Sequence, residues 1–106
     1  MVINDLFEVI KDRQRNKSEG SYTCYLFDKG TDKILKKVGE ECAETIIAAK
    51  NKDREELTNE ICDLAYHLLV LMANEGVDII NVEEELKRRT LEISNLKTMK
   101  ETNKNT

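Results

Sequence analysis

The sequence predicts an all-α protein of four to five helices, arranged as an antiparallel helical bundle that homodimerisation completes. The chain has no proline and only four glycines, and its abundance of Glu, Lys and Leu favours helices. No segment shows the sustained apolar and polar alternation of a half-buried strand. Several segments instead place apolar residues at spacings of three and four, which is the period of a helix.

Two short helices are expected before Gly30. An apolar face predicts the first, from Asn4 to about Arg15, through Ile3, Leu6, Phe7 and Ile10. Residues 16–24 (NKSEGSYTC) are polar and indicate a loop. A short helix follows, with Ser21 and Thr23 as alternative N-caps and Gly30 at its C-terminal end.

Two long helices are expected next. Thr31 is the predicted N-cap of a helix to about Lys50, whose apolar stripe is Ile34, Leu35, Val38, Cys42, Ile46 and Ala49. Asp53 with Glu56 three residues later resembles a capping box and predicts a helix to about Glu75, ended by Gly76. Between residues 61 and 73 this helix is apolar on nearly all sides, so some of its cover is expected from a second subunit.

A fifth helix is expected from near Asn81 to about Asn95. We expect residues 1–96 to form one domain and the polar residues 97–106 (KTMKETNKNT) to be a disordered tail. A net charge of −4 argues against a nucleic-acid binder. No apolar run is long enough for a membrane span, and no secretion signal is visible. The expected location is therefore cytoplasmic, with Cys42 and Cys62 as buried free thiols.

Two acidic clusters lie on the two long helices. Glu41 and Glu44 are three residues apart on one, and Glu60 and Asp63 are three residues apart on the other. Such spacing places each pair on one helix face. The segment between the clusters has the length of an antiparallel helix pair, so folding should bring the four carboxylates together.

Carboxylates that converge at a partly buried site need a neutralising partner. Oxygen ligands without thiolates or a histidine pair favour a hard cation, and Mg²⁺ also binds substrate phosphates. We therefore expect Glu41, Glu44, Glu60 and Asp63 to bind one or two Mg²⁺, with Glu40 as a further candidate ligand. The competing interpretation is a solvated acidic surface on an interaction module without catalysis.

Basic and hydroxyl side chains near the acids are candidates for substrate contacts. Lys33 and Lys37 lie on the same side of their helix as Glu44 and could hold phosphate oxygens. Ser21, Tyr22 and Thr23 are candidates for phosphate or ribosyl contacts, with ordinary helix capping as an equal alternative. His67 is expected to make supporting hydrogen bonds rather than bind metal. A di-iron bundle is disfavoured because it needs Glu-x-x-His pairs from two helices.

Three segments carry a resemblance to a known family: residues 20–23 (GSYT), 36–44 (KKVGEECAE) and 60–71 (EICDLAYHLLVL). The Glu-Glu-x-x-Glu and Glu-x-x-Asp patterns resemble the all-α NTP pyrophosphohydrolase (MazG-like) superfamily. The first and third segments narrow the resemblance to its phosphoribosyl-ATP pyrophosphohydrolase family, over about residues 5–89. Cys42 and Cys62 depart from this pattern, because small residues are usual at these positions.

The resemblance implies an enzyme of histidine biosynthesis. Its expected reaction is hydrolysis of phosphoribosyl-ATP to phosphoribosyl-AMP and pyrophosphate, with Mg²⁺ held by the four acids and water attacking phosphorus. Glu44 is a candidate base for that water. The resemblance also implies a homodimer or a dimer of dimers. The main rival function is a house-cleaning pyrophosphohydrolase that acts on free NTPs or dNTPs with the same acids.

Overall fold

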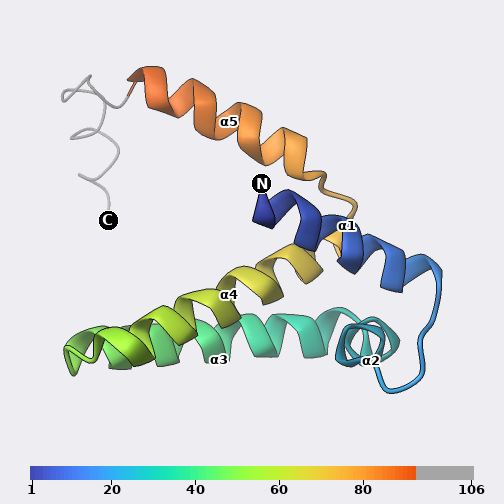
Figure 1. Ribbon diagram of the computed structural model, residues 1–106, viewed down its shortest axis with the longest axis horizontal. Coiled ribbons are helices and arrows are strands. Elements are labelled where there is room, and N and C mark those ends of the chain that lie inside the picture. Colours follow the sequence, from blue (N-terminus) through green and yellow to red (C-terminus); the bar gives the residue numbers. More distant parts are fainter. Residues whose placement is uncertain (93–106) are drawn as a thin grey trace.

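The computed structural model describes residues 1–92, and these residues form helices and loops without strands (Figure 1). The helices are α1 (Val2–Arg15), α2 (Tyr22–Lys29), α3 (Thr31–Lys50), α4 (Arg54–Glu75) and α5 (Ile79–Glu92). The prediction of an all-α fold is therefore confirmed. The predicted tail at 97–106 lies outside the described residues.

Helices α3 and α4 form an antiparallel hairpin, the most extensive contact between any two elements (Figure 1). Asn51 ends α3 by donating its backbone N–H to the Ile47 carbonyl at 3.0 Å. Lys52 has a φ of 57°, in the left-handed region, which reverses the chain direction. Asp53 then begins α4 as its N-cap, and its Oδ1 accepts the backbone N–H of Glu56 at 3.0 Å. The predicted cap of this helix is confirmed.

Removing the Asp53 cap should destabilise the hairpin. Asp53→Ala leaves the Glu56 N–H without its acceptor, so we expect the free energy of unfolding to fall by about 1 kcal/mol. Urea denaturation followed by circular dichroism measures this loss. Asp53→Asn keeps an acceptor at the same place and should retain most of the stability. An equal loss in both variants would contradict the capping role.

The apolar core lies at the end of the hairpin away from its turn. There α1 and α2 pack over the start of α3 and the end of α4 (Figure 1). The buried side chains of this core come from all four helices: Phe7, Ile10, Leu26, Ile34, Leu69 and Val70. The hairpin thus projects from a small core and carries its acidic residues along its middle.

Several helix ends differ from the predictions by one or two residues. Gly30, with a φ of 89°, is both the C-cap of α2 and the N-cap of α3, so Thr31 is the first helical residue rather than the cap. The Thr31 hydroxyl instead accepts a hydrogen bond from Asn74 Nδ2 at 2.9 Å. Helix α5 begins at Ile79 rather than near Asn81, because the Asp78 carboxylate accepts the N–H of Ile80.

The predicted apolar stripe of α3 is wrong over much of its length. The buried residues of α3 are Ile34, Glu41 and Ala48, whereas Leu35 and Ile46 are exposed. These three residues are seven apart and therefore form one buried line along α3, which we call its inner line. An acid, Glu41, occupies the middle of this line. Cys42 and Cys62 are also exposed, contrary to the prediction that they are buried, and Cys24 is the buried cysteine.

Candidate metal centre

Three carboxylates from the two arms of the hairpin converge beside its axis. Glu41 comes from α3, and Glu60 and Asp63 come from α4. One oxygen from each carboxylate lies within 4.8 Å of the other two. Glu60 and Asp63 meet because residues three apart lie on neighbouring positions of one helix face. Glu41 meets them because it occupies the line of α3 that faces α4.

Burial distinguishes two of these acids from an ordinary solvated surface, whereas Asp63 is exposed. Glu41 and Glu60 are only 6% and 8% exposed. Within residues 1–92, Glu41 Oε2 and Glu60 Oε2 are buried oxygens without a hydrogen-bond partner. Buried polar atoms are nearly always paired, so two unpaired acceptors in one cluster indicate a missing positive partner. The three carboxylates therefore fit a hard divalent cation bound through oxygen.

Without a bound cation, burial and mutual repulsion disfavour a negative charge on all three carboxylates of the cluster. The pKa of Glu60 is raised to about 8, first by sharing a proton with Glu44, then by burial and by Glu56 and Glu41. Burial is the main cause that raises the pKa of Glu41, and the charges of Glu44 and Asp63 add to it. Without metal, the cluster therefore keeps a proton at neutral pH, and a cation would take the place of that proton.

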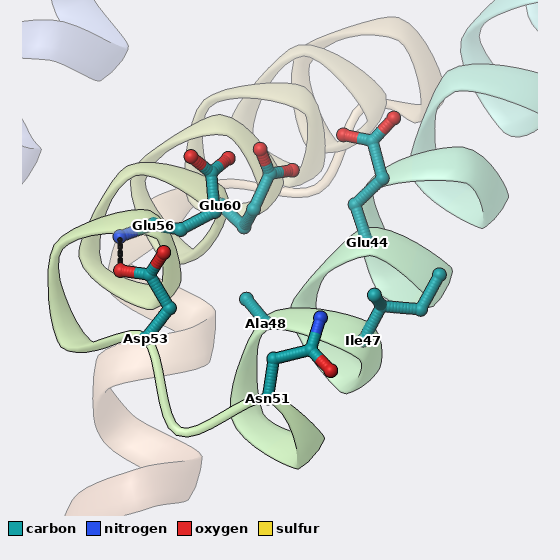
Figure 2. A pocket seen from close by; sticks show the side chains of 7 residues that line it. All are labelled: Glu44, Ile47, Ala48, Asn51, Asp53, Glu56 and Glu60. Carbon is teal, nitrogen blue, oxygen red and sulfur yellow. Dashed lines mark hydrogen bonds between the residues drawn. The ribbon is translucent and has the colours of Figure 1, made fainter.

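Two further glutamates border the cluster (Figure 2). Glu44 on α3 and Glu56 on α4 line a hollow of about 350 Å³ that Glu60 also lines. Figure 2 shows the Glu56 and Glu60 carboxylates side by side on α4, with Glu44 across from them on α3. Glu44 lies outside the converging triad but close enough to raise the pKa of Glu60.

Glu56 belongs to this site, although the capping pattern with Asp53 indicated only a structural role for it. The signal was its position four residues before Glu60 and seven before Asp63, which places all three acids on one helix face.

Lys37 supplies the nearest positive charge. Its Nζ lies 3.1 Å from a Glu40 oxygen and 3.9 Å from Glu41 Oε1. The hydrogen bond to Glu40 is the main cause that raises the pKa of Lys37 and lowers that of Glu40. Lys37 thus stands at the rim of the cluster. Lys33 lies one turn earlier, with its Nζ 5.9 Å from the centre of the Tyr25 ring.

Two of the three predicted loop residues, Tyr22 and Thr23, form hydrogen bonds to α4. Ser21 is the N-cap of α2, and its hydroxyl accepts the Cys24 N–H at 3.2 Å, which confirms one of the two alternative caps. Thr23 shares a short hydrogen bond with the Tyr66 hydroxyl. Tyr22 lies farther toward the cluster, with its hydroxyl 3.1 Å from His67 Nε2.

His67 connects Tyr22 to the acidic cluster. Its Nδ1 lies 2.7 Å from the backbone carbonyl oxygen of Asp63. A carbonyl only accepts, so Nδ1 carries a proton and donates it to this bond, while Nε2 is the atom that faces the Tyr22 hydroxyl. The ring is 5% exposed, and its two hydrogen bonds give it the supporting role that the sequence predicted.

The raised pKa of Glu60 predicts an unusual pH dependence in metal-free protein. The unfolded chain loses this proton near pH 4.5, whereas the folded chain keeps it until about pH 8. The folded state therefore binds more protons in this window, and stability should fall as the pH rises from 4.5 to 8. Melting temperatures measured in EDTA from pH 4.5 to pH 8 report this loss of stability. In Glu60→Gln the fall should be much smaller; an unchanged slope would contradict the raised pKa.

Known proteins resemble this chain in sequence over most of its length. A family model described as phosphoribosyl-ATP pyrophosphohydrolase matches residues 3–90. A phosphoribosyl-ATP pyrophosphatase of Clostridium botulinum is 55% identical over 95% of this chain and 92% of the relative. Proteins of the same name are 55% identical in Listeria welshimeri and 54% identical in Listeria monocytogenes. These two matches cover 94% and 96% of this chain, and 96% and 98% of the relatives.

Proposed function

Because the chain belongs to the phosphoribosyl-ATP pyrophosphohydrolase family, we propose that it hydrolyses phosphoribosyl-ATP to phosphoribosyl-AMP and pyrophosphate in histidine biosynthesis. The bond cut is the α–β phosphoanhydride. The observation that carries this proposal is the cluster of Glu41, Glu60 and Asp63, with two buried oxygens that lack partners. Such a cluster can hold a cation that in turn holds a polyphosphate.

Mg²⁺ is the proposed cofactor. It keeps water ligands and binds both carboxylates and phosphate oxygens, so it suits an oxygen-only cluster at the edge of a hollow. When bound, it supplies Lewis-acid polarisation of the phosphoryl group and acidification of a water. Glu41, Glu60 and Asp63 are its proposed ligands. Glu44, which lines the hollow with Glu60, and Glu40, which shares Lys37 with Glu41, are further candidates for a fourth ligand or for orienting water.

The remaining acids and bases have proposed roles in the transfer itself. Glu44 is exposed and borders the hollow, so its carboxylate can accept a proton from the attacking water. Lys37, already beside two glutamates, can stabilise negative charge on the departing pyrophosphate. We also propose that Ser21, Tyr22, Thr23 and Lys33 contact substrate, since Tyr22 is held beside the cluster by His67.

We propose that two copies pair through one face of the α3–α4 hairpin. Leu35, Ile61 and Leu68 each directly follow a residue that is buried on the inner side of its helix. In an antiparallel pair, such positions emerge on the same side of both helices. Ile46, eleven residues after Leu35, lies on the same line of α3. We call Leu35, Ile46, Ile61 and Leu68 the apolar face.

The apolar face lies opposite the acidic cluster, because Glu44 and Asp63 emerge on the other side of the hairpin. Large exposed apolar patches usually mark interfaces. Helix α5 also lacks buried residues and extends away from the hairpin (Figure 1). A homodimer would cover the apolar face, and a dimer of dimers could cover α5 as well. The described helices include none that could cross a membrane, and we propose a cytoplasmic enzyme because its substrate is a phosphorylated metabolite.

The alternative function is hydrolysis of free NTPs or dNTPs at the same acidic cluster. The deciding experiment is rescue of a bacterial strain that lacks this step of histidine synthesis, with Glu60→Gln as the control. Pyrophosphate release from phosphoribosyl-ATP, ATP and dUTP should be compared in parallel. Growth without histidine and preference for phosphoribosyl-ATP are the expected results. No rescue by soluble protein, together with faster release from ATP or dUTP, would favour the alternative.

A further inference from the structure

An exposed aromatic ring with two lysines lies next to the acidic cluster on the same surface. Tyr25 is 41% exposed, and the ammonium groups of Lys29 and Lys33 lie 5.8 and 5.9 Å from its ring centre. Within residues 1–92, neither ammonium forms an ion pair with a carboxylate, unlike Lys17 and Lys37. We call Tyr25, Lys29 and Lys33 the Tyr25 patch.

Contacts through Tyr22 join the Tyr25 patch to the acidic cluster. The Tyr22 and Tyr25 rings are stacked, with centres 6.0 Å apart and planes inclined by 23°. The Tyr22 hydroxyl meets His67, whose ring is bonded to the Asp63 backbone. Along α3, Lys33 precedes Glu41 by eight residues, which corresponds to about 12 Å. The patch and the cluster thus form two ends of one surface.

A hollow adjoins the Tyr25 patch at the rings of Tyr22 and Tyr25. This hollow of about 620 Å³ is lined by the loop before α2 and by α2 itself, including Tyr22 and Tyr25. This is within the usual range for small-molecule sites. The Lys17–Asp28 ion pair, at 3.0 Å, ties the loop to the helix and holds the wall of the hollow.

The substrate named by the family has a feature that ATP lacks. Phosphoribosyl-ATP carries a ribose phosphate on its adenine side, so it has a second anionic end separated from the triphosphate by a purine and two sugar rings. A phosphate monoester carries nearly two negative charges at neutral pH. An enzyme that prefers this substrate to ATP needs a cationic site at a distance from its metal.

We propose that the Tyr25 patch receives the phosphoribosyl end of the substrate and selects phosphoribosyl-ATP over ATP. Lys29 and Lys33 bind the terminal phosphate, and the Tyr25 ring packs against the adjacent sugar or base. This inference deepens the proposed function and rests on it. It assigns Lys33 to the end of the substrate opposite the pyrophosphate, whereas Lys37 serves the pyrophosphate.

The test is kinetic analysis of the double variant Lys29→Met and Lys33→Met, which keeps chain length but removes both charges. We expect KM for phosphoribosyl-ATP to rise about tenfold or more, since two charge-assisted hydrogen bonds are lost. The inhibition constant of pyrophosphate should change less than twofold. Inhibition by phosphoribosyl-AMP should weaken, whereas inhibition by AMP should not. Lys87→Met, an exposed lysine of α5, is the matched control.

The outcomes separate the inference from the proposed function. An unchanged KM overturns the inference, and so does an inhibition constant for pyrophosphate that rises in parallel with KM. The second result would place the lysines at the leaving group. Failure of the wild-type protein to hydrolyse phosphoribosyl-ATP would overturn the proposed function itself, whatever the variants do.

Discussion

Replacing Glu60 by Gln should lower kcat/KM for phosphoribosyl-ATP by about a thousandfold or more. The side chain keeps its size, but the cluster loses one of three converging carboxylates. The charge stabilisation that a bound metal supplies to a phosphoryl group is worth several powers of ten in rate. Initial rates of pyrophosphate release at saturating Mg²⁺ measure this loss.

The same variant should fold at least as well as the wild type without metal. Glu60 is the acid whose pKa is raised to about 8, so a neutral amide in its place removes the negative charge that would be repelled at alkaline pH. Glu84→Gln makes the same chemical change on an exposed part of α5 and should keep wild-type activity. A Glu60→Gln protein with wild-type kcat/KM would exclude this carboxylate from the catalytic site.

Ile46→Asp should separate the proposed dimer. Ile46 is 63% exposed in the single chain and is the member of the apolar face nearest the turn of the hairpin. In a twofold dimer each substitution acts twice, so the dissociation constant should rise by roughly a thousandfold. Light scattering with size-exclusion chromatography should then report the 12.2 kDa of one chain rather than twice that mass.

Ile47→Asp is the matched control for this experiment. Ile47 is 58% exposed, but it lines the hollow beside Glu60 on the other side of the hairpin. It should leave the oligomeric state unchanged whatever it does to activity. If both variants remain dimers, the interface lies elsewhere. If the wild-type protein is already a monomer in solution, the proposed pairing is wrong.

The sequence predicted the hairpin and its acids well because both depend on local rules. Asp53 and Gly76 mark the ends of α4 through a side-chain cap and a left-handed turn, which act over a few residues. The two acidic pairs come into register because the turn between the helices is short. Glu60 and Asp63 were therefore predicted together, and they meet Glu41 in the structure.

The inner line of α3 could not be predicted in the same way. Apolar residues occur on two neighbouring lines of this helix, one through Ile34 and Ala48 and one through Leu35 and Ile46. Periodicity detects both lines, but it does not say which of them packs against the other helices of the same chain and which is left on the surface. The structure buries the line that contains Glu41, which a hydrophobicity argument disfavours. Hydrophobicity does not favour an acid there unless a bound cation or a shared proton offsets its charge.

The most direct test of the account is Mn²⁺ binding followed by electron paramagnetic resonance, with Mn²⁺ as a paramagnetic substitute for Mg²⁺. Added to nucleotide-free wild-type protein, Mn²⁺ should lose its free-ion signal as it binds, and protons should be released at pH 7. Glu60→Gln should leave most of the free-ion signal intact. Equal binding by wild type and variant, without proton release, would contradict the claim that these carboxylates hold the metal.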